Sequence, residues 1–303
     1  MEIIKLNRTQ TITIDDNIVV GLGQFDGLHR GHLKLIEKVK KIGKRKDYRT
    51  AIITFDPHPD YILGKRQHNG YITPLPDKIK LLEELEIDFL FIIHFDLELS
   101  RMEPDEFYER FLKAFQAIVV GSDYRYGYRG KGNIETLKQT GKEVAVVKLL
   151  EFEKEKIGSN KIRDLLLEGQ VDKIKRLLDR HYYIIGKVTR GSQVGRTLGF
   201  KTANVELSEE YQILKKGVYA VYVYIGSKKF LGVCNIGNNP SVNFVERMRL
   251  EVHILDFDED IYNQEIKVEF LKRIRDELKF EKIDDLITQI KKDINYVMER
   301  FKI

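Results

Sequence analysis

The sequence predicts two domains: an N-terminal α/β domain built on a parallel sheet, and a C-terminal, mainly β domain that forms an antiparallel barrel with a terminal helix. Two observations support this prediction. Before residue 180, short apolar runs alternate with stretches of helical periodicity, which is typical of a parallel sheet covered by helices. From residue 182 to 268, strand-like runs follow one another with only turns between them. We therefore predict domains 1–180 and 181–303.

The first domain is expected to contain five strands, each an apolar or β-branched run, at 18–22, 51–55, 89–93, 118–120 and 144–148. The segments between them carry apolar stripes at helical spacing, namely His32, Leu35, Ile36 and Val39; Ile79, Leu82 and Leu85; and Phe107, Phe111 and Phe115. Two short helices should follow at 162–167 and 171–178. Parallel sheets of this kind bind ligands beyond the carboxyl ends of their strands, so the segment after the first run is a candidate site.

The second domain is expected to contain strands at 183–188, 218–225, 230–235, 250–257 and 265–270. Closely spaced strands without intervening helices form an antiparallel barrel or a sandwich, and we expect the barrel. The chain then shows helical spacing over five turns, carried by Ile283, Leu286, Ile287, Ile290, Ile294, Val297 and Phe301.

Composition restricts the class of protein. The 303 residues are 42% apolar and 33% charged, as in a globular protein. The net charge of +5 is compatible with anionic small molecules and is weak evidence for nucleic acid. A single cysteine, Cys234, excludes an internal disulfide framework and a multi-cysteine zinc site, and we expect it in the core. With no secretory signal and no run of membrane length, the expected location is the cytoplasm.

Residues 23–32, GQFDGLHRGH, follow the first strand and open a helix. One interpretation is a metal site in which Asp26 and His58 join His29 and His32. A second is a phosphate-binding turn, in which glycines let the backbone approach an anion, the helix start offers free N–H groups, and both histidines donate. A third is an ordinary glycine-rich turn. The phosphate interpretation explains most of the residues, because a metal cage has no need of the glycines.

These residues also carry a resemblance. G-x-F-D-G-x-H-x-G-H is similar to the ATP-binding signature of the HxGH nucleotidyltransferases, and its FDG form resembles that of bacterial FAD synthetases. Three later segments resemble further motifs of that family: TFDPHP at 54–59, VGSDYRYGYRGKGN at 120–133 and IGSNKIR at 157–163. The resemblance implies a Rossmann-like nucleotidyltransferase domain that transfers AMP from ATP to FMN.

The resemblance assigns roles to individual residues. His29 and His32 would be catalytic, holding the triphosphate and stabilising the transition state, and Asp56 and Asn133 would contact the flavin. The implied ATP-binding set is Gly23, Phe25, Asp26, Gly27, His29, His32, Asp123, Arg125, Ser159 and Arg163. The chain departs from the family pattern at Gln24, where asparagine is usual, and at Gly158 and Asn160, where hydroxyl residues are usual.

A second set of residues lies in RGSQVGRTLGFKTAN, at 190–204. Thr202 and Asn204 are two residues apart, so in an extended segment their side chains point to the same side. A hydroxyl and an amide oxygen are ligands that Mg²⁺ accepts beside phosphates. The segment resembles the riboflavin kinase signature G-R-x-L-G-F-P-T-A-N, with Lys201 in place of proline. The resemblance implies ATP binding by Gly195, Arg196, Gly199, Thr202 and Asn204, the last two also as metal ligands.

The remaining kinase residues are expected downstream. RLEVHILDF, at 249–257, alternates like a half-buried strand that places Glu251 and His253 on one face. It resembles the kinase strand with the catalytic glutamate, which implies that Glu251 accepts the proton of the ribityl hydroxyl. NIGNNPS, at 235–241, resembles a family turn with Ser241 for threonine. RDELKF, at 275–280, resembles a segment bordering the flavin, which implies flavin binding by Arg275.

The resemblance covers essentially the whole chain and implies a bifunctional enzyme. One module would phosphorylate riboflavin to FMN with ATP and Mg²⁺, and the other would adenylylate FMN to FAD with release of pyrophosphate. Its partners would be the small molecules ATP, riboflavin, FMN and FAD, the flavins as substrates and products, with no membrane and no nucleic acid. Two alternatives remain: only one module works, or the scaffold serves a flavin- or RNA-binding regulator. Both histidines and Glu251 are present, which favours catalysis.

Overall fold

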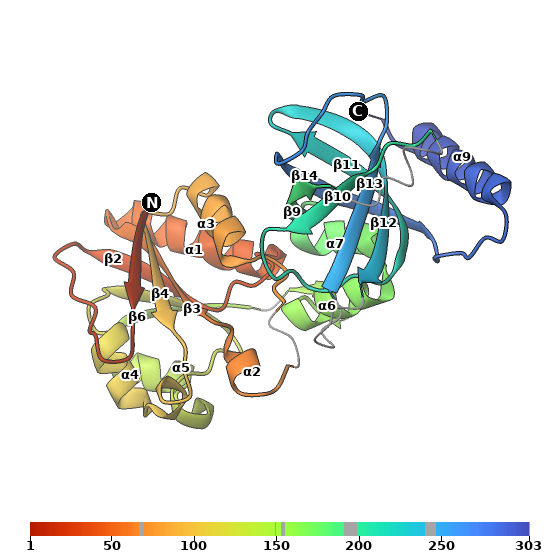
Figure 1. Ribbon diagram of the computed structural model, residues 1–303. Coiled ribbons are helices and arrows are strands. Elements are labelled where there is room, and N and C mark those ends of the chain that lie inside the picture. The colour runs from red at the N-terminus through yellow and green to blue at the C-terminus, as the bar shows by residue number, and fades with distance from the viewer. Residues whose placement is uncertain (67–69, 149, 153–154, 191–198, 240–246, 303) are drawn as a thin grey trace. The chain divides into compact units, whose positions relative to one another are not determined.

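The computed structural model describes residues 1–303 except 67–69, 149, 153–154, 191–198, 240–246 and 303. By contacts the chain divides into two compact units, Met1–Ser159 and Asn160–Ile303 (Figure 1). The predicted division at residue 180 stays a prediction for the ranges that carry each activity.

The first unit is built on a six-stranded sheet in the order β1-β4-β3-β2-β5-β6, and every neighbouring pair is parallel. The predicted parallel sheet is confirmed. The five expected strands are all present, and one strand, β1, was not predicted. The bounds are β1 Glu2–Leu6, β2 Ile18–Leu22, β3 Arg49–Asp56, β4 Phe89–His94, β5 Ala117–Gly121 and β6 Glu143–Val147.

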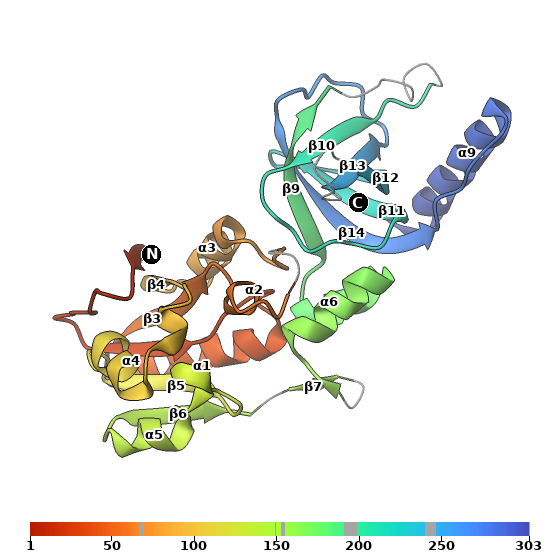
Figure 2. The ribbon, with the colours of Figure 1, turned by 60° about the horizontal axis from the view of Figure 1, so that its bottom comes forward.

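Helices cover both faces of this sheet because its strands are apolar on both sides. On one face, Val19 packs with side chains of α1 (Arg30–Lys46) and α3 (Leu75–Glu84). On the other face, Ile18 and Val20 pack with side chains of α4 (Pro104–Phe111) and α5 (Ile134–Gln139). Figure 2 labels both helices beside the sheet. The sheet therefore exposes its strand ends, and the turn after β2 lies at the carboxyl end of a central strand.

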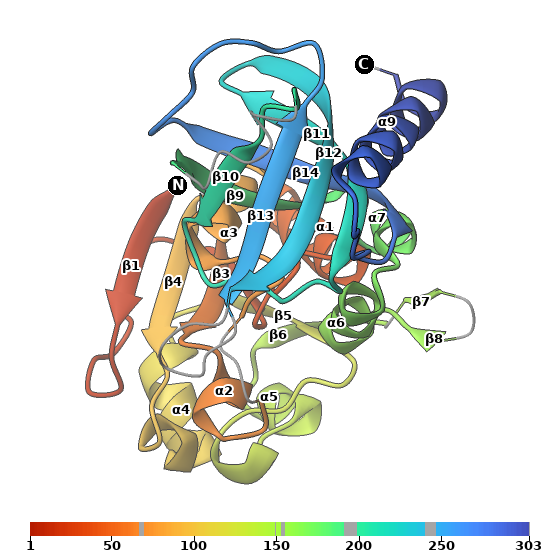
Figure 3. The same ribbon diagram turned by 45° about the vertical axis from the view of Figure 1, so that its right-hand side comes forward.

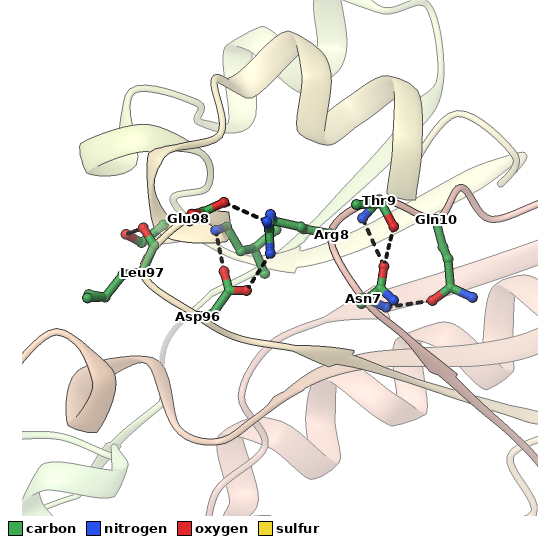
Figure 4. Close-up of polar contacts among 9 residues, drawn as sticks. Asn7, Arg8, Thr9, Gln10, Asp96, Leu97 and Glu98 are labelled. Carbon is green, nitrogen blue, oxygen red and sulfur yellow. Dashed lines mark hydrogen bonds and ion pairs between the residues drawn. The ribbon is translucent and has the colours of Figure 1, made fainter.

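Strand β1 lies at the sheet edge, where it pairs only with β4. A polar cluster fixes its end (Figure 4): the Arg8 guanidinium contacts Asp96 Oδ2 at 3.0 Å and Glu98 Oε2 at 2.6 Å. The Asn7 side-chain oxygen also accepts from the N–H of Thr9 at 2.9 Å. The contact of Arg8 with Asp96 joins segments 88 residues apart, and β1 pairs with the similarly distant β4, which explains why local periodicity did not reveal the strand.

The second unit contains a closed barrel of six antiparallel strands in the order β10-β13-β12-β11-β14-β9, with β9 paired to β10 (Figure 3). The predicted barrel is confirmed, and β10 is the strand that was not predicted. Its bounds are β9 Tyr182–Thr189, β10 Ala203–Leu207, β11 Gly217–Ile225, β12 Lys228–Asn239, β13 Arg247–Ile254 and β14 Glu265–Arg275. Cys234 is fully buried in β12, as expected, and burial raises the pKa of its thiol.

Several shorter helices and strands lie among the sheet strands and before the barrel strands along the chain. The predicted helices at 162–167 and 171–178 correspond to α6 (Ser159–Glu168) and α7 (Val171–Leu178). A small antiparallel hairpin precedes α6 (Figure 3). Lys156 in this hairpin forms an ion pair with Asp123. The other short elements are α2 Pro59–Ile62, η1 Leu99–Arg101, η2 Tyr128–Gly130, β7 Glu151–Phe152 and β8 Glu155–Lys156. No helix in the described part of the chain is long and apolar enough to cross a membrane.

The terminal helix α9 (Ile283–Arg300) packs on the barrel through Val297, which contacts Ala220 and Leu271 in one buried cluster. Its predicted apolar stripe is covered only toward the C-terminal end, since Ile283 is 63% exposed. A bidentate ion pair adds to the packing: the Arg275 guanidinium meets the buried Asp293 carboxylate at 2.7–3.1 Å. The helix is therefore held by a charged contact as well as by apolar burial.

We expect the substitution Asp293→Ala to lower the free energy of unfolding by about 3 kcal/mol, because it leaves a largely buried guanidinium without its partner. Urea unfolding followed by circular dichroism measures the loss, and amide hydrogen exchange in β14 and α9 locates it. Glu299→Ala, which removes an exposed carboxylate 3.7 Å from Arg300, is the control and should change stability by less than about 0.5 kcal/mol. Equal losses in the two variants would contradict the assignment.

Candidate functional site

The turn after β2 has an unusual backbone. Phe25, Gly27 and Leu28 all have positive φ angles, of 51°, 88° and 41°. Glycine adopts this region readily, but the two other residues are strained in it, at about 1–3 kcal/mol each. Phe25 and Leu28 are fully buried in the cluster under α1, and their burial offsets that strain. The turn is therefore held in one shape by the core beneath it.

His29 and His32 lie where this turn becomes α1. His29 is the N-cap of the helix, and its Nδ1 accepts from the His32 N–H at 3.3 Å. The two imidazole rings stack, with centroids 3.7 Å apart and planes 17° from parallel. A side chain at Gly31 would begin 3.1 Å from the His29 ring, so glycine leaves room for the stack. The structure thus brings both predicted catalytic histidines together at the positive end of a helix, where anions bind.

The alternative metal site is not assembled here. The Asp26 carboxylate accepts from the N–H groups of Ile72 and Thr73 at 3.0 and 3.1 Å. The His58 Nδ1 accepts from the Asp60 N–H at 3.1 Å and caps α2. Within the described residues, no group of three histidine, cysteine or acidic side chains is placed to hold a metal ion. Asp26 instead ties the turn to the segment that precedes α3.

Ser159, the first residue of α6, also reaches this turn, because its hydroxyl donates to the Asp26 carbonyl at 2.8 Å. The hydroxyl hydrogen of Ser159 is therefore already used in a hydrogen bond to the turn. Arg163 lies one helical turn later, is buried, and falls in the second compact unit. Contact of either residue with ATP stays a prediction.

Gln24, which stands where the family usually has asparagine, connects the turn after β2 to β3. Its Nε2 donates to the Phe55 carbonyl at 2.9 Å. Its Oε1 is buried and has no hydrogen-bond partner among the described residues, so the turn keeps one unused acceptor. The longer side chain is thus accommodated by reaching across to β3.

The backbone of Gln24 is held by two residues that sequence reasoning missed as a pair. Its carbonyl oxygen accepts from the Thr54 hydroxyl at 2.9 Å and from the Lys78 ammonium at 2.8 Å. Lys78 is 1% exposed, and burial lowers its pKa to about 8. A signal was present in the sequence: Lys78 precedes Leu82 by four positions, so a charged residue stands on the apolar stripe of its helix.

Asp56, a predicted flavin residue, lies at the carboxyl end of β3. Its Oδ1 accepts from the Tyr71 hydroxyl at 2.9 Å, and the same hydroxyl oxygen accepts from the His58 N–H at 2.9 Å. Burial and the nearby Asp56 carboxylate raise the pKa of Tyr71, so its hydroxyl stays a donor. Tyr71 is a further residue that the motifs did not indicate.

The loop after β5 carries three more predicted residues. Asp123 is exposed and paired with Lys156, and Arg125 is exposed with no polar partner among the described residues. The Asn133 side-chain oxygen caps α5 by accepting from the N–H groups of Glu135 and Thr136 at 2.8 and 3.1 Å. Asn133 thus stabilises the start of α5, and its contact with flavin stays a prediction.

In the barrel, three polar side chains lie in register on adjacent strands: Asn204 of β10 pairs with Glu251 of β13, which pairs with Asn235 of β12. Arg249 bridges two of them, contacting Asn204 Oδ1 at 3.3 Å and forming an ion pair with Glu251. A cavity of about 200 Å³ lies beside this row, lined by Lys216, Asn235, Gly237, Arg249, Glu251 and Glu277. The predicted catalytic glutamate therefore borders this cavity.

The other predicted kinase residues lie at the start of β10. Thr202 is exposed, immediately before the strand, and borders a second cavity of about 280 Å³. Lys201 and Asp258, which both line that cavity, form an ion pair, and the Lys201 carbonyl oxygen is 2.8 Å from His253 Nδ1. Gly199 has a φ of 85°, which glycine allows. Gly195 and Arg196 lie outside the described residues, as does Ser241.

Arg275 is committed to the fold. Its guanidinium makes the ion pair with Asp293 and also donates to the Asp276 carbonyl at 2.9 Å. The predicted flavin contact of Arg275 is therefore untested, and a substitution there would also disturb α9.

Comparison with known proteins finds a separate family model for each part of the chain. The FAD synthetase family model matches residues 11–161, and the riboflavin kinase family model matches residues 178–301. Proteins named bifunctional riboflavin kinase/FMN adenylyltransferase are 37% identical in Listeria monocytogenes, 39% in Bacillus subtilis and 32% in Escherichia coli K12. The alignments cover 92%, 91% and 92% of this chain and 91%, 90% and 91% of those proteins, respectively.

A solved structure shares the whole fold. It is the crystal structure of a Streptococcus pneumoniae protein described as a macrolide-efflux protein, with a TM-score of 0.90, 32% identity and 100% coverage of both chains. That description belongs to the neighbour. With both family models matched in order and relatives above 30% identity over about nine-tenths of their length, the chain belongs to the bifunctional riboflavin kinase/FMN adenylyltransferase family.

Proposed function

We propose that this chain makes FMN from riboflavin and then FAD from FMN, with ATP as the donor in both steps, and that each reaction uses its own residues. The observation that carries the proposal is the separation of two constellations. The stacked pair His29 and His32 lies in the part matched by the FAD synthetase model. The row of Asn204 and Glu251 lies in the part matched by the riboflavin kinase model. The expected location is the cytoplasm.

In FAD formation, a phosphate oxygen of FMN attacks the α-phosphorus of ATP, and the bond to the β-phosphate oxygen breaks to release pyrophosphate. This transfer needs positioning and charge stabilisation, and no covalent enzyme intermediate. The N–H groups at the start of α1 and the imidazoles of His29 and His32 supply donors where negative charge develops. Asp123, Arg125 and Arg163 are the further residues we assign to the nucleotide.

In FMN formation, the 5′-hydroxyl of riboflavin attacks the γ-phosphorus of ATP and ADP leaves. Glu251 accepts the hydroxyl proton. Because the carboxylate has two oxygens, Oε1 can stay with Arg249 while Oε2 accepts that proton. The Thr202 hydroxyl and the Asn204 amide oxygen fit Mg²⁺, a cation that takes few protein ligands and completes its shell with phosphates and water. When bound, the cation would neutralise charge on the transferred phosphate.

Replacing the histidines with polar residues that preserve the cap, as His29→Asn and His32→Gln, should lower FAD formation about 100-fold or more each, because each removes a transition-state donor. FMN formation in the same preparations should stay within twofold of the unaltered chain. Chromatographic separation of FMN and FAD over time measures both rates. Parallel losses of both products would contradict the assignment of the histidines to one module.

The substitution Glu251→Gln should have the opposite effect. FMN formation should fall about 10²- to 10⁴-fold, because the base is lost while its shape is kept. FAD formation from supplied FMN should be unchanged. Glu206→Gln, an exposed glutamate two residues beyond Asn204 on the same strand, is the matched control. An effect of Glu206→Gln as large as that of Glu251→Gln would show that the general charge of the barrel, and not a base, sets the rate.

Restoring the family residue through Lys201→Pro should lower the Michaelis constant for ATP in FMN formation about two- to fivefold. Proline limits the backbone before binding and lowers the ordering cost by about 0.4–1 kcal/mol. It also removes the ion pair with Asp258, so Asp258→Asn separates that loss from the backbone effect. Steady-state FMN formation at varied ATP is the measurement, and no change in rate or Michaelis constant would refute the backbone argument.

A further inference from the structure

Lys78 is a buried cation for which the proposed reactions give no role so far. It lies on α3, is 1% exposed, and directs its ammonium at two acceptors, the Gln24 carbonyl at 2.8 Å and the Thr54 hydroxyl at 3.2 Å. Burying an ammonium group is unfavourable, and an apolar side chain would fill the same space without that penalty. The hydrogen bonds that the Lys78 ammonium donates must therefore offset this penalty.

The Lys78 ammonium binds the backbone where the strained turn begins. The Gln24 carbonyl accepts from both Thr54 and Lys78, and the next residue, Phe25, has a φ of 51°. On the other side of the turn, Asp26 accepts from the N–H groups of Ile72 and Thr73, just before α3 begins. Residues 72–78 thus hold the turn at two residues, at Asp26 through its carboxylate and at Gln24 through the Lys78 ammonium.

We propose that Lys78 is a positioning residue for FAD formation, whose ammonium fixes the Gln24 carbonyl and so sets the turn that places His29 and His32. This inference rests on the assignment of those histidines to FAD formation. A displacement of 1 Å in such a turn is enough to reduce the rate of a transfer that depends on positioning about 100-fold. Lys78 is not a catalytic residue, because it acts through Gln24.

The test compares Lys78→Met with Lys80→Met, a control two residues away on the same helix where the lysine is exposed. We expect Lys78→Met to lower kcat for FAD formation at least tenfold, with the Michaelis constant for FMN changed less than threefold. FMN formation should be unchanged in both variants, and Lys80→Met should make FAD normally. A kcat for FAD formation within twofold in Lys78→Met would overturn the proposal. If the unaltered chain makes no FAD at all, the proposed function fails instead.

A pH profile of the unaltered chain decides the question even if Lys78→Met does not fold. Burial lowers the pKa of Lys78 to about 8, although Asp26 and Asp56, the charged groups that face it from the turn and from β3, act to raise it. Thr54 and the Gln24 carbonyl, which also face it, do not titrate, and the hydroxyl of Tyr71, bonded to Asp56, has a raised pKa. Above pH 8 the ammonium is therefore lost in the folded chain.

Two quantities should then change in opposite directions. Between pH 8 and the ordinary lysine pKa, the folded chain has released a proton that the unfolded chain still binds, so this group makes the folded state more stable as pH rises. The ratio of FAD-forming to FMN-forming kcat should fall at least fivefold from pH 7 to 9.5, since the neutral amine holds the carbonyl less firmly. Both rates are measured on the same samples with supplied FMN and riboflavin. A constant ratio would overturn the proposal.

Discussion

The first unit depends on holding one reversed turn at the carboxyl end of β2. The chain must leave a central strand and start α1 within a few residues, and it does so with positive φ at Phe25, Gly27 and Leu28. Such a backbone persists only where its surroundings over-determine it. Here the core fixes the turn from below, while hydrogen bonds from β3, α3, the segment before α3 and the start of α6 fix it from the sides. Those contacts therefore also fix the positions of the stacked histidines His29 and His32, which follow the turn.

The barrel positions its residues by a different device, the register of a closed ladder. Asn204, Glu251 and Asn235 come together because three neighbouring strands are hydrogen-bonded in one alignment. A slip by one residue would turn each of these side chains into the core and bring Val252 or Leu250 outward, which burial forbids. Apolar packing inside the barrel therefore specifies the polar row on its outer face.

Several residues of the recognised motifs also serve the fold. Asn133 caps α5, Arg275 anchors α9 through Asp293, and the Ser159 hydroxyl supports the turn beside the histidines. A side chain that already makes good hydrogen bonds can contact a ligand only with its remaining atoms or after a rearrangement. Motif residues thus form two groups. Some, such as Arg125 and Glu251, face solvent or a cavity, whereas others make hydrogen bonds that stabilise the surrounding fold.

The sequence by itself determined the two fold classes, most of the strands, a helix start near Gly31 and the same-face placement of Glu251 with His253, because each of these follows from local periodicity or glycine chemistry. It did not reveal β1 and β10, which are short and stabilised by distant partners. Only the tertiary structure decided what holds the turn: Lys78 meets the Gln24 carbonyl across 54 residues of chain. Periodicity reports which face of an element is buried, whereas the partner that meets a buried charge is chosen by how distant elements pack.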